Sequence, residues 1–146
     1  MNIPGTGVNA RGRHALPPGR RLPSNMAPTT GRRTDGSKLA IGSPGADRIT
    51  TSIFQVLDGL CLRHLPLQEA IDAPRLHVQL DAAGEPTVRF ERAGDLPRAA
   101  ADSGLATLAH EPVTMWFGGV GATLRHACGE LEAAADPRRA AAFGVS

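Results

Sequence analysis

The sequence contains no tyrosine, a single tryptophan (Trp116) and a single lysine (Lys38) among its 146 residues. Aromatic residues make up only 3% of the chain, so a hydrophobic core must be built from Leu, Ile, Val and Ala. The hydrophobic fraction of 41% is sufficient for such a core, and the length is that of one ordinary domain. The net charge of +2 is too small to indicate nucleic-acid binding.

Long apolar segments are also missing. No apolar run approaches the roughly 18 residues that a membrane-spanning helix needs, so no membrane partner is predicted. The segment 1–30 contains Arg and Pro but no apolar stretch typical of a signal peptide, so the compartment is left open.

Residues that commonly hold metals are few and poorly spaced. Cys61 and Cys128 are far apart, and Cys61, on the apolar side of a helical pattern, is predicted to be a buried small hydrophobic residue. The five histidines share no helical i, i+4 pair and no cysteine spacing: His14, His64, His77, His110 and His126. We therefore predict neither a metal nor a cofactor.

The chain divides into two parts by composition. Residues 1–37 are rich in Gly, Pro, Arg, Ser and Thr and show no structural period, which predicts an extended or looped arm. Its arginines are either solvated or available to an anion or a partner. Residues 38–146 carry alternating and helical patterns, which predict an α+β core.

Within the core the patterns predict a helix, a second short helix ended by Pro74, and mostly strands afterwards. The first helix is expected from Asp47 to about Arg63 because Ile49, Ile53, Val56, Leu57 and Leu60 recur at helical spacing. A weak helix is expected over 95–104, and strands over 37–42, 75–80, 86–91, 105–113, 115–125, 129–134 and the last residues after a turn at 136.

The stretch Gly42-Ser43-Pro44-Gly45 joins the first core strand to the first helix. No Gly-Lys-Ser/Thr follows it, so it is not a Walker phosphate-binding loop, and no Gly-x-Ser-x-Gly nucleophile motif is present. By itself the motif is compatible with a plain strand-to-helix turn. The less favoured alternative is an anion or oxyanion site formed by the N–H groups of Gly45 and Ala46.

Five stretches in order resemble the C-terminal part of the γ-glutamyltransferases (γ-glutamyltranspeptidases): PPGRRLPSNMAPT, GSPGADRITTSIFQVL, EAIDAPRLHVQ, FGGVGATLR and ADPRRAAA. The resemblance implies part of an αββα sandwich of the N-terminal-nucleophile hydrolase type. It also implies a precursor that cleaves itself into a large and a small subunit. The new N-terminal threonine of the small subunit then carries γ-glutamyl groups from glutathione-like donors to water or amino acids. Family members are often periplasmic or secreted.

The resemblance assigns four site residues. Ser24 and Asn25 match the serine pair that holds the α-carboxylate of the γ-glutamyl group, with Asn25 in place of the second serine. Gly45 and Ala46 match the glycine pair whose N–H groups form the oxyanion hole. Arg48 and the segment 73–77 match structural parts of the pattern.

Two family features are missing from the printed sequence. The nucleophile lies in a Thr-Thr-His segment, but neither Thr29-Thr30 nor Thr50-Thr51 is followed by histidine. The acidic residue that binds the substrate's α-amine should fall within 4–8, where the sequence is PGTGV. We therefore expect a truncated small-subunit chain that is inactive alone, with the large subunit and a γ-glutamyl substrate as partners. The alternatives are a non-catalytic γ-glutamyl or amino-acid binding module, and a chain that does not fold alone.

Overall fold

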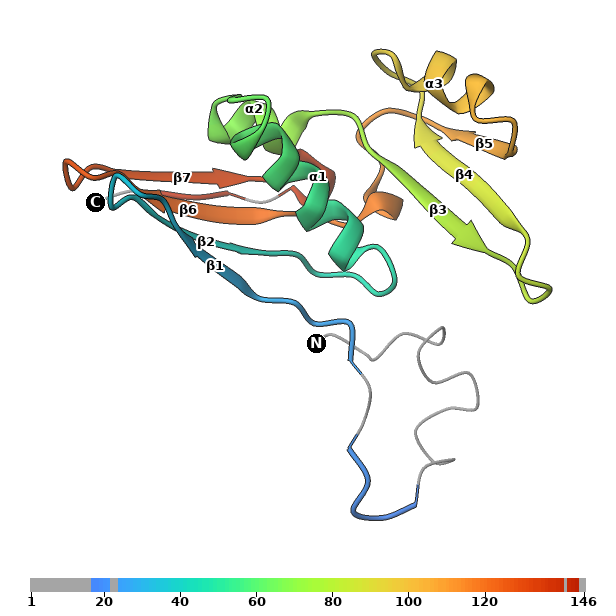
Figure 1. Cartoon of the computed structure of the whole chain (residues 1–146), viewed down its shortest axis with the longest axis horizontal. Helices are drawn as coiled ribbons and strands as arrows, with labels where there is room; N and C mark the ends of the chain where they lie inside the picture. The colour runs from blue at the N-terminus through green and yellow to red at the C-terminus, as the bar shows by residue number, and fades with distance from the viewer. Residues whose placement is uncertain (1–16, 22–23, 141, 145–146) are drawn as a thin grey trace.

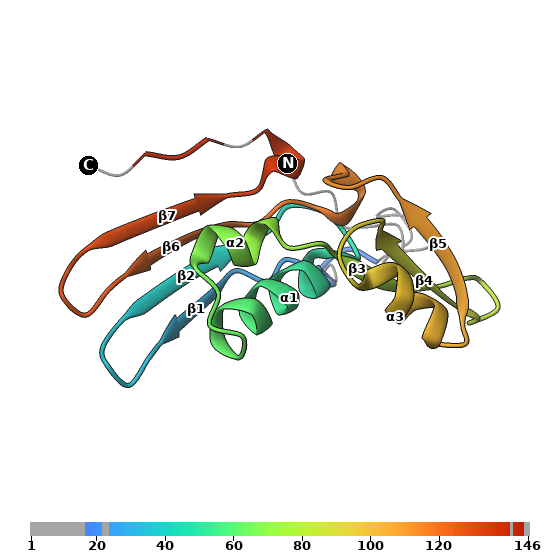
Figure 2. The same cartoon turned by 90° about the horizontal axis from the view of Figure 1, so that it is seen from above.

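The computed structural model describes residues 17–21, 24–140 and 142–144, which form two β-sheets and their covering helices (Figure 1). The four-stranded sheet is fully antiparallel, in the order β1-β2-β6-β7. Its strands are β1 (Thr29–Arg32), β2 (Lys38–Gly42), β6 (Gly121–Arg125) and β7 (Leu131–Ala135). Helices α1 (Ile49–Cys61) and α2 (Leu67–Asp72) cover one face of it (Figure 2).

The main core lies between this sheet and helix α1. Ile49, Ile53, Val56 and Leu60 form a buried stripe along the helix, as the sequence period predicts. They meet buried side chains of the sheet and of α2: Ile41, Leu67, Ala70, Ile71, Val120, Ala122, Leu124 and Ala134. The opposite face of the sheet is not covered by any described element.

The three-stranded sheet, in the order β3-β4-β5, has a smaller core of its own. Strands β3 (Leu76–Leu80) and β4 (Pro86–Glu91) form an antiparallel hairpin, and β5 (Ala106–His110) pairs parallel to β4. Period-2 alternation directs Val88 and Phe90 toward Ala100 of helix α3 (Leu96–Asp102). Arg89 and Glu91 therefore lie on the other face of β4.

Four expectations differ from the structure. Residues 115–125 are not one strand: Met115–Phe117 form a 3₁₀ turn, η2, and Gly118, with a φ of +82°, separates it from β6. The turn expected at 136 is present as the 3₁₀ turn η3 (Pro137–Arg139), but the described residues 142–144 form no strand after it. The inner end of the arm is strand β1.

Cys61 is the fourth difference. It is exposed, whereas the sequence predicts a buried residue. As the last residue of α1 it follows Leu60, and one step along a helix turns a side chain by about 100° away from the buried stripe.

Among the described residues, every helix is too short or too polar to span a membrane.

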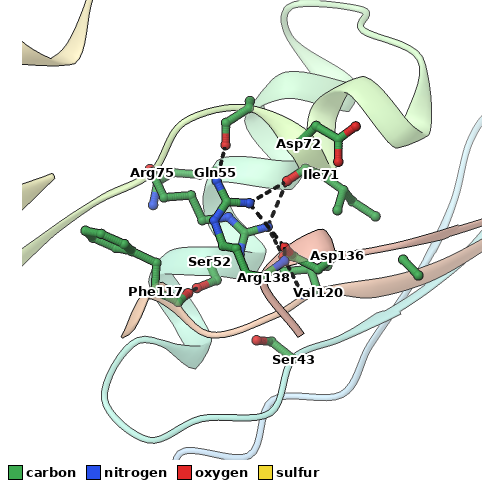
Figure 3. Close-up of polar contacts among 12 residues, drawn as sticks. Ser43, Ser52, Gln55, Ile71, Asp72, Arg75, Phe117, Val120, Asp136 and Arg138 are labelled. Carbon is green, nitrogen blue, oxygen red and sulfur yellow. Dashed lines mark hydrogen bonds and ion pairs between the residues drawn. The ribbon is translucent and has the colours of Figure 1, made fainter. Parts of the chain in front are cut away.

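Four charged side chains are buried where the two sheets meet, and Figure 3 shows three of them, Arg75, Asp136 and Arg138. Arg75 precedes β3, Glu91 ends β4, Asp136 follows β7 and Arg138 lies in η3; their exposed fractions are 1%, 1%, 1% and 4%. Arg138 is the centre of the cluster. Its Nε donates to Glu91 Oε1 at 2.7 Å, its Nη2 pairs with Glu91 Oε2, and its Nη1 donates to Asp136 Oδ1 at 3.2 Å.

Backbone carbonyl groups satisfy further donors of Arg138, whereas Nε and Nη1 of Arg75 have no partner among the described residues. Arg138 also donates to the carbonyl oxygens of Ile71 and Ala73, at 3.1 and 3.0 Å, between α2 and β3. Arg75 Nη2 lies 2.6 Å from Asp136 Oδ2. Burial lowers the pKa of Arg75, opposed by the Asp136 carboxylate, whereas hydrogen bonds and charge from Glu91 outweigh burial and raise the pKa of Arg138. Both guanidinium groups therefore stay charged at neutral pH.

We expect Glu91→Gln to lower the free energy of unfolding by about 3–5 kcal/mol, because it leaves Arg138 buried without its main counter-charge. Urea denaturation followed by circular dichroism measures the change. Arg92→Gln is the matched control, because Arg92 pairs with Glu111 at the exposed surface and such pairs are worth at most about 1 kcal/mol. Equal losses in the two variants would contradict a stabilising role for the buried cluster.

Candidate functional site

The turn between β2 and α1 has two free backbone donors. Helix α1 begins at Ile49, whose N–H donates to the carbonyl of Ala46 at 3.2 Å. Neither the Gly45 nor the Ala46 N–H forms a hydrogen bond with another of the described residues. Gly45 has a φ of +142°, a conformation that residues with a Cβ rarely adopt. The turn can therefore present two N–H groups to an oxyanion at the start of a helix.

A segment far along the sequence packs against this turn. The segment is Phe117-Gly118, and a Cβ on Gly118 would lie 3.2 Å from the Pro44 carbonyl oxygen and 3.3 Å from Ser43 Oγ. Buried Ser52 Oγ lies 2.7 Å from the carbonyl oxygens of both Arg48 and Phe117 (Figure 3). Only glycine fits where the two segments touch, so the position of the turn depends on residues some seventy positions later in the chain.

The arm reaches the same turn through one contact. Asn25 Nδ2 donates to Asp47 Oδ1 at 3.0 Å. Ser24 is exposed, and its Oγ accepts from the N–H of Met26 at 3.1 Å. Asp47 is exposed and pairs with no cation of the described residues. The structure thus brings Asn25 beside the segment that begins at Gly45.

Trp116 lies at the centre of a second group of polar residues beside α1. Arg48 Nε donates to the Trp116 carbonyl oxygen at 3.0 Å, and the Arg48 guanidinium lies 4.6 Å from the centroid of the indole. The Arg89 guanidinium lies 5.0 Å from that centroid, and the His110 ring stacks on it at 4.8 Å. Cation–π attraction and stacking thereby join α1, η2 and the three-stranded sheet.

His77 belongs to the same group. It is the cross-strand partner of Arg89, its ring lies edge-on to Trp116 at 5.9 Å, and Thr51 Oγ1 lies 3.0 Å from its Nδ1. Burial, followed by the positive charge of Arg48, lowers the pKa of His77, and burial followed by Arg89 lowers the pKa of His110. Both imidazoles are therefore neutral at pH 7.

The sequence singled out Ser24, Asn25, Gly45 and Ala46 but missed Asp47, Arg89, His110 and Trp116 as a group. The cross-strand pairing of His77 with Arg89 follows from the predicted hairpin, so the sequence does predict that these two side chains are neighbours. The described residues contain no cluster of three His, Cys, Asp or Glu side chains that could hold a metal ion.

We expect the free energy of unfolding to fall as the pH drops below 6.5. The ordinary pKa of histidine is 6.5, and both His77 and His110 have lower values in the folded chain. Between the two values the unfolded chain binds protons that the folded chain does not, so stability present above 6.5 is lost as the pH falls through the folded-state pKa. Urea denaturation at about pH 7.5 and about pH 5.5, read by Trp116 emission, measures this loss.

His110→Asn should reduce the pH dependence, because asparagine does not titrate. His64→Asn serves as its control, since His64 is exposed and makes no ring contact with Trp116. Identical pH dependence in the native chain and in His110→Asn would contradict the role of this ring.

Comparisons with known proteins agree with this architecture. A family model described as "Gamma-glutamyltranspeptidase" matches residues 2–145. The chain is 45% identical over 74 residues to a glutathione hydrolase proenzyme of Pseudomonas aeruginosa, covering 51% of this chain and 13% of that protein. It is 36% identical over 87 residues to an acylase ACY 1 proenzyme of a Pseudomonas species, covering 52% of this chain and 16% of that protein. The chain thus spans less than a fifth of these curated relatives.

A solved structure gives the wider match. The gamma-glutamyltranspeptidase of Pseudomonas nitroreducens, complexed with L-DON, is 32% identical, with a TM-score of 0.70 over 90% of this chain and 65% of that one. The expected α+β fold, part of an N-terminal-nucleophile hydrolase sandwich, is thereby confirmed. On the extent of the family match and the shared fold, the chain belongs to the gamma-glutamyltranspeptidase family.

Proposed function

We propose that this chain supplies the small-subunit part of a γ-glutamyl-transfer site and, by itself, binds its ligand without turnover. The free N–H groups of Gly45 and Ala46 carry the proposal, because they lie where the family resemblance requires an oxyanion hole. In the whole enzyme, a threonine hydroxyl would attack the γ-carbonyl of a glutathione-like donor, and these two N–H groups would stabilise the negative oxygen. The amine would leave, and water or an amino acid would then take the acyl group from the threonine ester.

The arm would hold the α-carboxylate of the donor. Ser24 can donate its hydroxyl hydrogen, and Asn25 keeps one of its two amide hydrogens free after donating to Asp47. Asp47 supplies what the segment 4–8 lacks, a carboxylate for the α-amine. The α-carboxylate and the α-ammonium share one carbon, so their partners must be close, and Asn25 and Asp47 lie 3.0 Å apart.

The rest of the enzyme would cover the open face of the β1-β2-β6-β7 sheet. Two shallow hollows of about 560 and 410 Å³ adjoin on this face, floored by Thr30, Ala40 and Thr123. Small side chains let a second sheet approach closely. Arg32, Lys38 and Arg125 are paired across three adjacent strands, exposed, and without an acidic partner among the described residues. This row favours a large-subunit surface that carries carboxylates.

We expect the purified chain to release no product from a γ-glutamyl anilide, because neither of its Thr-Thr pairs is followed by histidine. Absorbance of the released aniline measures turnover, with a Ser24→Ala variant as the control for contaminating activity. Turnover by the native chain that disappears in Ser24→Ala would contradict the prediction.

We expect Asp47→Asn to weaken glutathione binding by about tenfold or more, since a charged hydrogen bond to the ammonium is lost. Isothermal titration calorimetry measures the affinity. Asp58→Asn is the control, because Asp58 lies within α1, three turns from the ligand groups. Equal affinities of the two variants would remove Asp47 from the site, and no binding to the native chain would contradict the proposed function itself.

A further inference from the structure

Two buried polar atoms beside Trp116 have no hydrogen-bond partner among the described residues. They are Nε of Arg89 and Nε2 of His110. The two residues lie on neighbouring strands, β4 and β5, on the same face of the sheet. Buried polar groups are almost always satisfied by protein, water or a ligand, so water or a ligand would complete this pair.

The surroundings of the pair are positively charged. The Arg48 and Arg89 guanidinium groups both lie within 5.0 Å of the Trp116 ring centroid. Neither forms an ion pair within the described part of the chain, and Arg89 donates no hydrogen bond there. The buried carboxylate of Glu91, the cross-strand partner of His110, is occupied by Arg138 on both oxygens.

We propose that Arg89 and His110 form a carboxylate-binding subsite on the wall of Trp116, with Arg48 as its second cation. A carboxylate offers two oxygens in one plane, which suits two N–H donors side by side. His110 is neutral because its pKa is lowered, so it can donate from Nε2 when its other ring nitrogen is unprotonated. An anion would also relieve the repulsion between the two guanidinium groups.

The ligand class follows from the position of the subsite. Arg48 comes directly after Asp47, so the subsite adjoins the segment proposed to bind the donor. We assign it to the carboxylate of the acceptor amino acid or short peptide, an assignment that rests on the proposed function. The donor groups, Ser24 and Asn25, belong to the arm and are separate from it.

The test uses glycylglycine as the probe and glycylglycinamide, which has no carboxylate, as its matched control. Trp116 is the sole tryptophan, so its emission reports occupancy directly, and calorimetry gives the affinity. We expect glycylglycine to change the emission and the amide to have no effect. Arg89→Gln should weaken glycylglycine binding by about tenfold or more, while Arg89→Lys should restore part of it.

Arg92→Gln is the control variant, because Arg92 follows β4 but is exposed and paired with Glu111; it should bind glycylglycine as the native chain does. Equal binding of glycylglycine and the amide would overturn the subsite, as would unchanged binding in Arg89→Gln. Inorganic phosphate binding as tightly as glycylglycine would overturn the assignment to a carboxylate. Glutathione binding distinguishes the two proposals. If it persists in Arg89→Gln and weakens in Asp47→Asn, the proposed donor site stands even where the carboxylate subsite is overturned.

Discussion

The contact between the Arg138 guanidinium and the Glu91 carboxylate determines how the two sheets are joined. Glu91 ends β4 of the smaller sheet, whereas Arg138 follows β7 of the larger one. The core of the smaller sheet and α3 has only three buried apolar residues, Val88, Phe90 and Ala100, so apolar burial alone gives the position of this sheet little specificity. Charged hydrogen bonds are directional, so the bidentate contact of Arg138 with Glu91 favours one relative position of the sheets.

The same cluster extends toward the candidate site. Asp136 Oδ2 accepts from the N–H of Val120 at 2.8 Å, which fixes the chain just after Gly118 and Gly119. Gly119 has no room for a side chain, because a Cβ there would collide with Arg139. Gly118 in turn touches the turn that ends at Gly45. The turn therefore rests on a segment that is anchored by the ion cluster, which links a structural network to the free N–H groups.

Local patterns predicted a large part of the fold. The period of Ile49, Ile53, Val56 and Leu60 predicted α1, and alternation predicted the β3–β4 hairpin. Strand β1 also had a local signal that was missed, since Asp35-Gly36 is a strong hairpin dipeptide and closes the β1–β2 turn. The turn η3 had a local signal in Asp136-Pro137, an N-cap residue followed by proline, whereas carbonyl oxygens of η2 accept from Arg48 and Ser52, far away in the sequence.

The candidate site shows the same division between local and distant information. Gly45 and Ala46 belong to a short motif, so the sequence alone could name them. The group around Trp116 joins α1, two strands and η2, and only the folded chain shows that Arg48, Arg89 and His110 meet at one ring. Asp47 is an intermediate case. It is next to the motif in the sequence, but only the folded chain shows that Asn25 of the arm donates to it.

The proposed replacement of the missing acid by Asp47 changes what positions the ligand. The resemblance expects the acid within 4–8, far along the chain from the oxyanion donors, whereas Asp47 directly precedes Arg48, the N-cap residue of α1. The proposed ammonium partner and the oxyanion donors then share one short piece of backbone, 45–47. The positions of the ammonium and of the oxyanion would consequently depend on the start of α1 and its contacts with Phe117 and Gly118, while Ser24 and Asn25 of the arm would hold the α-carboxylate.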